Sequence, residues 1–295
     1  MNLFRQLLHN RKALIGVTIL VIVILVAIFA PMLTEFTPTQ RVGRPHQPPS
    51  PEHWLGTTRL GYDVFTRMVY GARVSLAVGF GAGVLITVIG TVLGIIAGYK
   101  GGVVDEVITF FTNMILVIPN LPLLLVLAAF IGQASPLVIA VILGFTSWAW
   151  GVRVTRSETL SIRQRDFVKS AETLGEPGWR VMAFEIFPNL ISIVGINLIG
   201  SVLFAVISEA TLEFLGLGDP NTTSWGIMLY NAQNSSALSV GAWWDLLTPC
   251  VALAVLGLGL ALINFAIDEI ANPRLRTGGM LLRWAGLIRK GEGQL

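Results

Sequence analysis

The chain has 295 residues, of which 54% are hydrophobic and 13% are charged, and its net charge is +3. Soluble domains carry about 25% charged residues, so the composition excludes an ordinary soluble protein and places the chain in a lipid bilayer. The basic residues form no cluster of the kind that binds nucleic acid. The single cysteine, Cys250, excludes a disulfide within the chain and is expected to be buried. The three histidines lack ligand spacing, so we expect them on the surface and expect no metal site.

Six apolar runs predict six transmembrane helices and hence an all-α, polytopic membrane protein. Each run is long enough to cross the hydrocarbon core of a bilayer. In chain order the runs are Leu14–Leu33, Val74–Tyr99, Val103–Ile131, Pro136–Val152, Leu190 to about Ser208, and Leu246–Ile267. The first run is longer than the apolar part of a signal peptide, so we expect it to remain as an anchor.

Two of these runs carry residues that shape helices. The second run has small residues at helical spacing, namely Gly79, Gly83, Gly90, Gly94 and Gly98. Such residues let helices approach closely in lipid, and we favour packing within the chain over a dimerisation motif. The third run holds Pro119 and Pro122, which are expected to kink its helix. A kink at membrane depth is tolerated where protein or a water-filled cavity lies beside it.

The placement of lysine and arginine predicts that both termini lie in the cytoplasm, because cytoplasmic loops are enriched in these residues. In this orientation 15 of the 20 basic residues fall on cytoplasmic pieces, and five fall in the external segment before the second run. The predicted division of the chain is an N-terminal cytoplasmic segment with the first helix (1–34), an external segment with an interfacial helix (35–73), a five-helix core (74–271) containing a cytoplasmic coupling loop (153–189), and a cytoplasmic tail (272–295).

The sequence argues against a catalytic, cofactor-binding or metal-binding site within this chain. No predicted span holds a central cluster of acids, histidines or metal ligands, and no phosphate-binding GxxxxGK[ST] loop is present. We therefore expect no catalytic, cofactor-binding or metal residues, and any energy for transport must come from a partner. A stand-alone membrane enzyme or a structural scaffold is the alternative from another class. The enzyme would need a buried nucleophile–base pair or metal triad, and the scaffold would need neither a kinked span nor a docking helix.

The polar stretch after the fourth run is the most informative part of the sequence. Phe167–Thr173 is predicted to form a short helix, with Asp166 as its N-cap. Gly175 can end this helix in a left-handed turn. Trp179 then provides an aromatic side chain that could fill a pocket on a partner. The alternative is a loop that packs against its own bundle.

The same stretch resembles the EAA signature of permease subunits of binding-protein-dependent ABC importers. The matching positions are Lys169-Ser170-Ala171, Gly175 and Ile186-Phe187-Pro188. Lys169 stands where that signature has glutamate, and Ser170 where it has alanine. Further stretches resemble the C-type permeases of the dipeptide/oligopeptide/nickel group, namely GTTRLGYDVFTRMVYGARVSL at 56–76, SEATLEFLGLG at 208–218, SWG at 224–226 and NPRLR at 272–276.

The resemblance implies a type I ABC importer permease fold in a prokaryotic cytoplasmic membrane. It also implies four partners, which are a homologous second permease, two ATP-binding cassette ATPase subunits and an extracytoplasmic substrate-binding protein. ATP and Mg would be bound by the ATPases, and this chain would hold no cofactor. Peptides are the expected cargo, with oligosaccharides second and nickel less favoured.

The resemblance also assigns roles to residues. Those expected to couple the chain to an ATPase are Phe167, Lys169, Ser170, Ala171, Leu174, Gly175, Trp179 and Pro188. Glu209, Glu213 and Trp225 are candidates for external docking or for the pathway. We expect the segments 34–73 and 209–245 to dock the binding protein, with residues 54–72 as an interfacial amphipathic helix. The tail at 277–295 is predicted to be a basic amphipathic helix.

Overall fold

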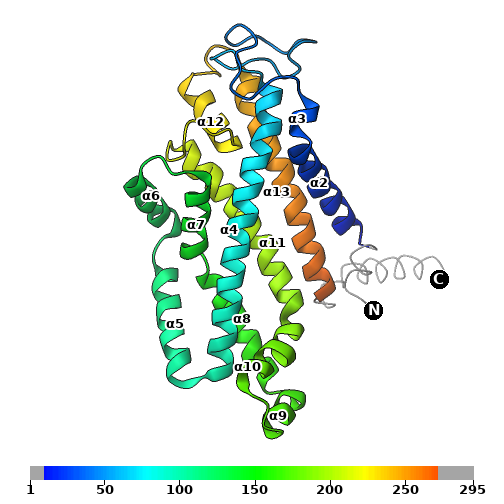
Figure 1. The fold of residues 1–295 in the computed structure, drawn as a ribbon, viewed down its shortest axis with the longest axis vertical. Helices are drawn as coiled ribbons and strands as arrows, with labels where there is room; N and C mark the ends of the chain where they lie inside the picture. Colours follow the sequence, from blue (N-terminus) through cyan, green and yellow to red (C-terminus); the bar gives the residue numbers. More distant parts are fainter. Residues whose placement is uncertain (1–9, 272–295) are drawn as a thin grey trace, which may run out of the picture.

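The computed structural model describes residues 10–271, so the predicted tail helix at 277–295 and the motif at 272–276 lie outside the described residues. The described chain is a bundle of helices (Figure 1). In order they are α2 (Arg11–Ile28), α3 (Ala30–Leu33), α4 (Val64–Lys100), α5 (Gly102–Val117), α6 (Asn120–Ile131), α7 (Pro136–Thr146), α8 (Ala149–Arg163), α9 (Asp166–Thr173), α10 (Gly178–Arg180), the π-helical turn η1 (Val181–Ile186), α11 (Phe187–Phe214), α12 (Trp225–Asn234) and α13 (Trp243–Ala271).

The six predicted runs form four long helices and two bent pairs, which make six spans if each bent pair crosses the bilayer once. The helix α2, the helix α4, the continuous helix Gly178–Phe214 and the helix α13 are each long and apolar enough to cross a bilayer. The pair α5 and α6 is bent by 86°, and the pair α7 and α8 by 42°. The first bend falls at Ile118 and Pro119, where the prolines predicted a kink. The second bend, at Ser147 and Trp148, has no proline and was not predicted.

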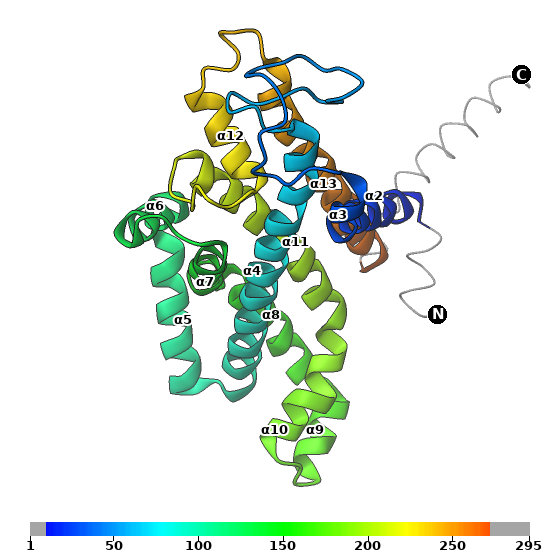
Figure 2. The same cartoon turned by 45° about the horizontal axis from the view of Figure 1, so that its top comes forward.

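The central element of the bundle is α4, which contacts α2, α7, α8, α11 and α13 (Figures 1 and 2). Its glycines lie at these contacts. A Cβ atom added to Gly94 would lie 2.6 Å from Thr155 Cβ of α8, and one added to Gly98 would lie 2.7 Å from Thr159 Cβ. Gly79 and Gly83 lie in the same way against Val206 and Val202 of α11, respectively, and a Cβ added to Gly90 would lie 3.1 Å from Gly151 Cα of α8. The glycine pattern therefore serves packing within the chain, as the sequence predicted.

The prediction of an interfacial helix over 54–72 is wrong for its first half. The helix begins only at Val64, because the side chain of Asp63 caps it by accepting a hydrogen bond from Thr66 N at 2.8 Å. Before it, Gly56 and Gly61 have φ of 72° and 77°, a backbone conformation that interrupts a helix. The segment instead folds over the end of α13, where Trp244 Nε1 donates to Thr57 O at 3.2 Å.

Two expectations about single residues are also wrong. His53 was expected on the surface, but it is buried, with Nδ1 3.0 Å from Asp63 Oδ1, because the carboxylate satisfies its ring nitrogen. Cys250 was expected to be buried, but it is exposed on α13. Apolar sequence in a membrane protein does not distinguish a core face from a lipid face, and this explains the error for Cys250.

The close approach of α4 and α8 gives a test of the packing. Replacing Gly94→Ala adds a methyl group next to the Thr155 side chain and Val152 O, so we expect a loss of stability of about 1–3 kcal/mol from overpacking. Replacing Gly81→Ala is the control on the same helix, since no described atom lies within 4 Å of its added Cβ. Thermal unfolding in detergent should show a lower midpoint for the Gly94 variant only. Equal midpoints for both variants would contradict the packing argument.

Candidate functional site

The helix α9 lies at one tip of the molecule, at the opposite end from α12 (Figures 1 and 2). It confirms the short helix predicted for this stretch, with a correction at its start. Asp166 is the first helical residue rather than the N-cap, and the N-cap position belongs to Arg165, which makes no side-chain capping bond. Asp166 still contributes favourably there, since a negative charge in the first turn complements the helix dipole.

One fully buried side chain fastens α9 to the bundle. Val168 packs in an apolar cluster with Ile162 of α8, Ile186 of η1 and Leu190 of α11. Ala171, one turn later, packs against the same cluster. Because α8 and α11 both contribute to this cluster, it joins α9 to both of these helices.

The end of α9 is a Schellman motif built on Gly175, which confirms the predicted left-handed turn. Gly175 has φ of 82°, and its N–H donates to Glu172 O at 3.1 Å. The N–H of Glu176 donates to Ala171 O at 3.1 Å, which is the second bond of the motif. No described atom lies within 4 Å of a Cβ added at Gly175, so the backbone angle rather than crowding requires glycine here.

The end of α9 and the turns that follow it expose large apolar side chains. Leu174, the C-cap of α9, is 84% exposed, and Trp179 on α10 and Phe184 on η1 are each 64% exposed. The two aromatic rings meet edge to face, with centroids 6.4 Å apart. The other predicted coupling residues that are exposed are Phe167, Lys169, Ser170 and Pro188. Exposed apolar side chains gathered at one place mark an interaction surface.

The chain is helical through most of the region predicted as a coupling loop, residues 153–189. The helix α8 continues to Arg163, and a new helix begins at Gly178. The reason is that α8 buries Thr155, Thr159 and Ile162 along one face while its charged side chains point outward. Only the residues from 164 to 177, which include α9, project beyond the long helices.

At the other end of the molecule, two buried glutamates connect α11 with α12. Glu209 and Glu213 lie one turn apart on α11, and both are fully buried. Ser75 Oγ of α4 donates to Glu209 Oε1 at 3.2 Å, and Ser224 Oγ donates to Glu213 Oε2. Ser224 is also the N-cap of α12. The carboxylates therefore hold the start of α12 against the bundle, and their role in docking or in a pathway stays a prediction.

Trp225 is part of the same arrangement. Its backbone N–H donates to Ser75 Oγ at 3.3 Å, and its indole Nε1 donates to Met68 O at 2.9 Å. Its ring is buried against α4, close to Gly71. The next residue, Gly226, allows α12 to approach α11 closely, since its added Cβ would lie 2.8 Å from Glu213 Cβ. The sequence pattern located Glu213 and Trp225 but did not reveal that they are buried and connected.

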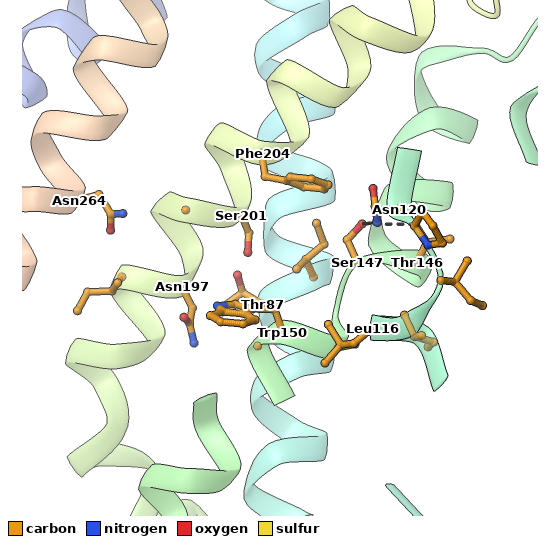
Figure 3. A pocket seen from close by; sticks show the side chains of 18 residues that line it. Thr87, Leu116, Asn120, Thr146, Ser147, Trp150, Asn197, Ser201, Phe204 and Asn264 are labelled. Atoms are coloured by element: carbon orange, nitrogen blue, oxygen red, sulfur yellow. Dashed lines mark hydrogen bonds between the residues drawn. The ribbon is translucent and has the colours of Figure 1, made fainter. Parts of the chain in front are cut away.

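A pocket of about 550 Å³ lies between these two ends, and no sequence motif predicted it. It is lined by α4, α11 and α13 and by the bends of both broken pairs, α5–α6 and α7–α8. Figure 3 shows its polar side chains, with Asn197, Ser201 and Phe204 following one another along α11. The residues that line it are Ile86, Thr87, Ile115, Leu116, Ile118, Pro119, Asn120, Thr146, Ser147, Ala149, Trp150, Gly151, Ile196, Asn197, Gly200, Ser201, Phe204 and Asn264, and none of them is ionisable.

The chain matches known membrane proteins over most of its length. Residues 90–277 match the family model described as the binding-protein-dependent transport system inner membrane component. Residues 2–49 match the model described as the N-terminal TM domain of oligopeptide transport permease C. The two matches together extend from the first helix into the residues beyond α13.

Individual relatives resemble the chain from end to end. The dipeptide transport system permease protein DppC of Alkalihalophilus pseudofirmus is 34% identical, with 93% of this chain and 90% of that protein covered. The protein of the same name from Bacillus subtilis is 32% identical, with coverage of 92% and 85%. The oligopeptide transport system permease protein OppC of Bacillus subtilis is 31% identical, with coverage of 90% and 87%.

The contact between the start of α12 and Glu213 of α11 can be tested independently of function. Replacing Ser224→Ala removes the cap of α12 and leaves the buried Glu213 carboxyl without this donor, so we expect a loss of about 2–4 kcal/mol. Replacing Ser135→Ala removes only a cap, that of α7, and should cost about 1 kcal/mol. Hydrogen exchange measured by mass spectrometry should show α12 opening selectively in the Ser224 variant. Equal protection of α12 in both variants would contradict the role of Glu213.

Proposed function

The chain belongs to the family of inner membrane components of binding-protein-dependent transport systems, and we propose that it forms half of the pathway of an ATP-driven peptide importer. The family consists of transport subunits rather than enzymes. The peptide cargo is supported by the relatives, whose names all refer to dipeptide or oligopeptide transport. None of the three is named for sugar or nickel transport, so the oligosaccharide alternative gains no support.

The observation that carries the proposal is the exposed apolar surface at the end of α9 and in the turns that follow it. Leu174 at the C-cap of α9, Trp179 on α10 and Phe184 on η1 are exposed, and Val168 joins α9 to the bundle. Apolar and aromatic side chains of this kind act as anchors in pockets of a partner protein. We assign this surface to an ATPase subunit, so that α9 seats in a groove of that subunit and follows its movement.

The proposed assembly has four partners around this chain. A homologous second permease completes the pathway, two ATPase subunits bind ATP and Mg, and an external binding protein delivers the peptide. Closure of the ATPases displaces α9, and the shared contacts of Val168 pass the movement to α8 and α11. The spans then shift between inward-open and outward-open states, which is a change in a two-state equilibrium.

The orientation follows from the same assignment. The tip that carries α9 lies in the cytoplasm, as do both termini, in agreement with the excess of basic residues predicted for that side. The end that carries α12 and the segment 34–63 then faces the binding protein. The buried bonds of Ser224 and Trp225 support this role because they hold α12 in a fixed position, and a docking surface needs such rigidity.

Assembly is the first test of the proposal. The chain is purified in detergent from its native membrane, and its partners are identified by mass spectrometry. We expect a second permease and ATPases, and ATP hydrolysis that rises when the binding protein and peptide are added. Recovery of this chain alone, without ATPase activity, would contradict the importer assignment and favour a stand-alone membrane protein.

The contact made by α9 gives a sharper test. Replacing Leu174→Asp places a charge where we propose an apolar contact, so peptide uptake and stimulated ATP hydrolysis should fall by about tenfold or more. Leu174 is 84% exposed, so the fold and membrane insertion should not change. Leu174→Met is the matched control and should retain uptake, because it keeps an apolar side chain of similar volume. Normal uptake in the aspartate variant would rule out this contact.

A further inference from the structure

Both breaks in the transmembrane helices occur at the same pocket. The α5–α6 break contributes Ile118, Pro119 and Asn120, and the α7–α8 break contributes Thr146 and Ser147. The two breaks contact each other, since Asn120 Nδ2 donates to Ser147 Oγ at 3.4 Å (Figure 3). Non-helical backbone at membrane depth is stable only where protein buries it or where it lines a water-filled cavity. The breaks therefore point to a hydrated pocket rather than to a contact with lipid.

The opposite wall carries polar side chains that the protein does not use. Asn197 and Ser201 on α11 and Asn264 on α13 make no side-chain hydrogen bond within the described part of the chain. Two of their atoms, Asn197 Nδ2 and Asn264 Oδ1, are buried without a partner. An unpaired buried polar atom costs about 1–3 kcal/mol, so these amides retain hydrogen-bonding capacity that a ligand in the pocket can use.

The chemistry of the lining defines the ligand. Amide and hydroxyl groups offer both donors and acceptors, and the lining carries no charge. Such a wall does not discriminate between acidic and basic side chains, and its groups match the N–H and C=O that every peptide has. Trp150 and Phe204, 63% and 38% exposed, add aromatic surface for apolar contact with side chains of any kind.

We infer that this pocket is a binding site for peptide main-chain amides at membrane depth, formed by Asn197, Ser201 and Asn264 with Trp150 and Phe204 beside them. The inference rests on the proposed function, since it names how this chain contacts its cargo. Binding is weak and independent of the side chains. A transported peptide must leave the site again, and a few neutral hydrogen bonds of about 1 kcal/mol each permit this.

Two glycines of α11 allow the position of the site to be tested without disturbing the fold. No described atom lies within 4 Å of a Cβ added to Gly200 or to Gly195. Only Gly200 lines the pocket. Gly200→Leu therefore adds an apolar side chain to the pocket wall with open space at its Cβ, and Gly195→Leu is the matched control on the same helix.

The first experiment uses the complete importer with its binding protein in membrane vesicles and measures uptake of Ala-Ala-Ala. We expect Gly200→Leu to lower uptake by about tenfold or more and Gly195→Leu to leave it unchanged. Uptake by Gly200→Leu equal to that of the unsubstituted chain would overturn the inference. Absence of uptake by the unsubstituted importer would instead refute the proposed function, so the two failures are distinguishable.

The second experiment tests which groups of the cargo are recognised. Uptake of Ala-Glu-Ala and Ala-Lys-Ala is compared with that of analogues in which an ester replaces one amide and removes its N–H. Asn197→Leu with Asn264→Leu should reduce the ratio of amide to ester uptake by roughly threefold to tenfold, equally for both peptides. The binding protein is the same in every assay, so a change in this ratio reports on the pocket. An unchanged ratio, or an effect on only one of the two peptides, would overturn the inference.

Discussion

The structure depends on one constraint, which is that a bilayer offers the backbone no hydrogen-bond partners. A polypeptide segment inside the hydrocarbon core must therefore be helical, or it must lie where protein or water forms hydrogen bonds with its backbone. The described chain follows this rule throughout its apolar runs. The two bent pairs, α5–α6 and α7–α8, meet at the pocket, where Asn120 and Ser147 bond to each other across the two breaks. The position of the pocket is thus a consequence of the same rule that makes the protein helical.

The second constraint is the lack of a hydrophobic driving force between helices in lipid, which leaves close packing to hold the bundle together. The helix α4 meets this constraint with glycines. Gly94 and Gly98 let α8 approach, and Gly79 and Gly83 let α11 approach. The helices α8 and α11, which also fasten α9, are therefore both held close to α4 by these glycines.

Local features were predictable from the sequence, and features that join distant residues were not. The spans follow from composition, and the end of α9 follows from Gly175, whose left-handed backbone angle is a property of a single residue. The bend after α7 had no proline to signal it. Thr146 Oγ1 bonds back to Ile142 O at 2.7 Å, but Thr87 makes the same kind of bond within the continuous helix α4. The burial of Glu209 had no local signal, since its partner Ser75 is 134 residues away.

The pocket could not be predicted from the sequence for the same reason. Five segments contribute to it, and no two of its polar side chains form a sequence motif. The prediction of an interfacial helix failed for a different reason. The stretch from 54 to 63 has the composition of such a helix, but Gly56 and Gly61 take positive φ and Asp63 starts the helix later. The average composition of this stretch favours a helix, but the backbone angles of the two glycines and the cap formed by Asp63 prevent one.

The 28 residues of α11 connect all three regions that the function requires. At about 1.5 Å per residue the helix is about 42 Å long. Its first turns contain Leu190, which packs in the cluster that fastens α9. Its middle carries Asn197 and Ser201 at the pocket, and its last turns carry Glu209 and Glu213 at the start of α12. A rigid helix cannot move at one end without moving the rest, so a displacement of α9 changes the pocket wall and the seat of α12 in the same step. This shared helix gives a physical reason why ATP hydrolysis at one end and delivery of cargo at the other would act on one equilibrium.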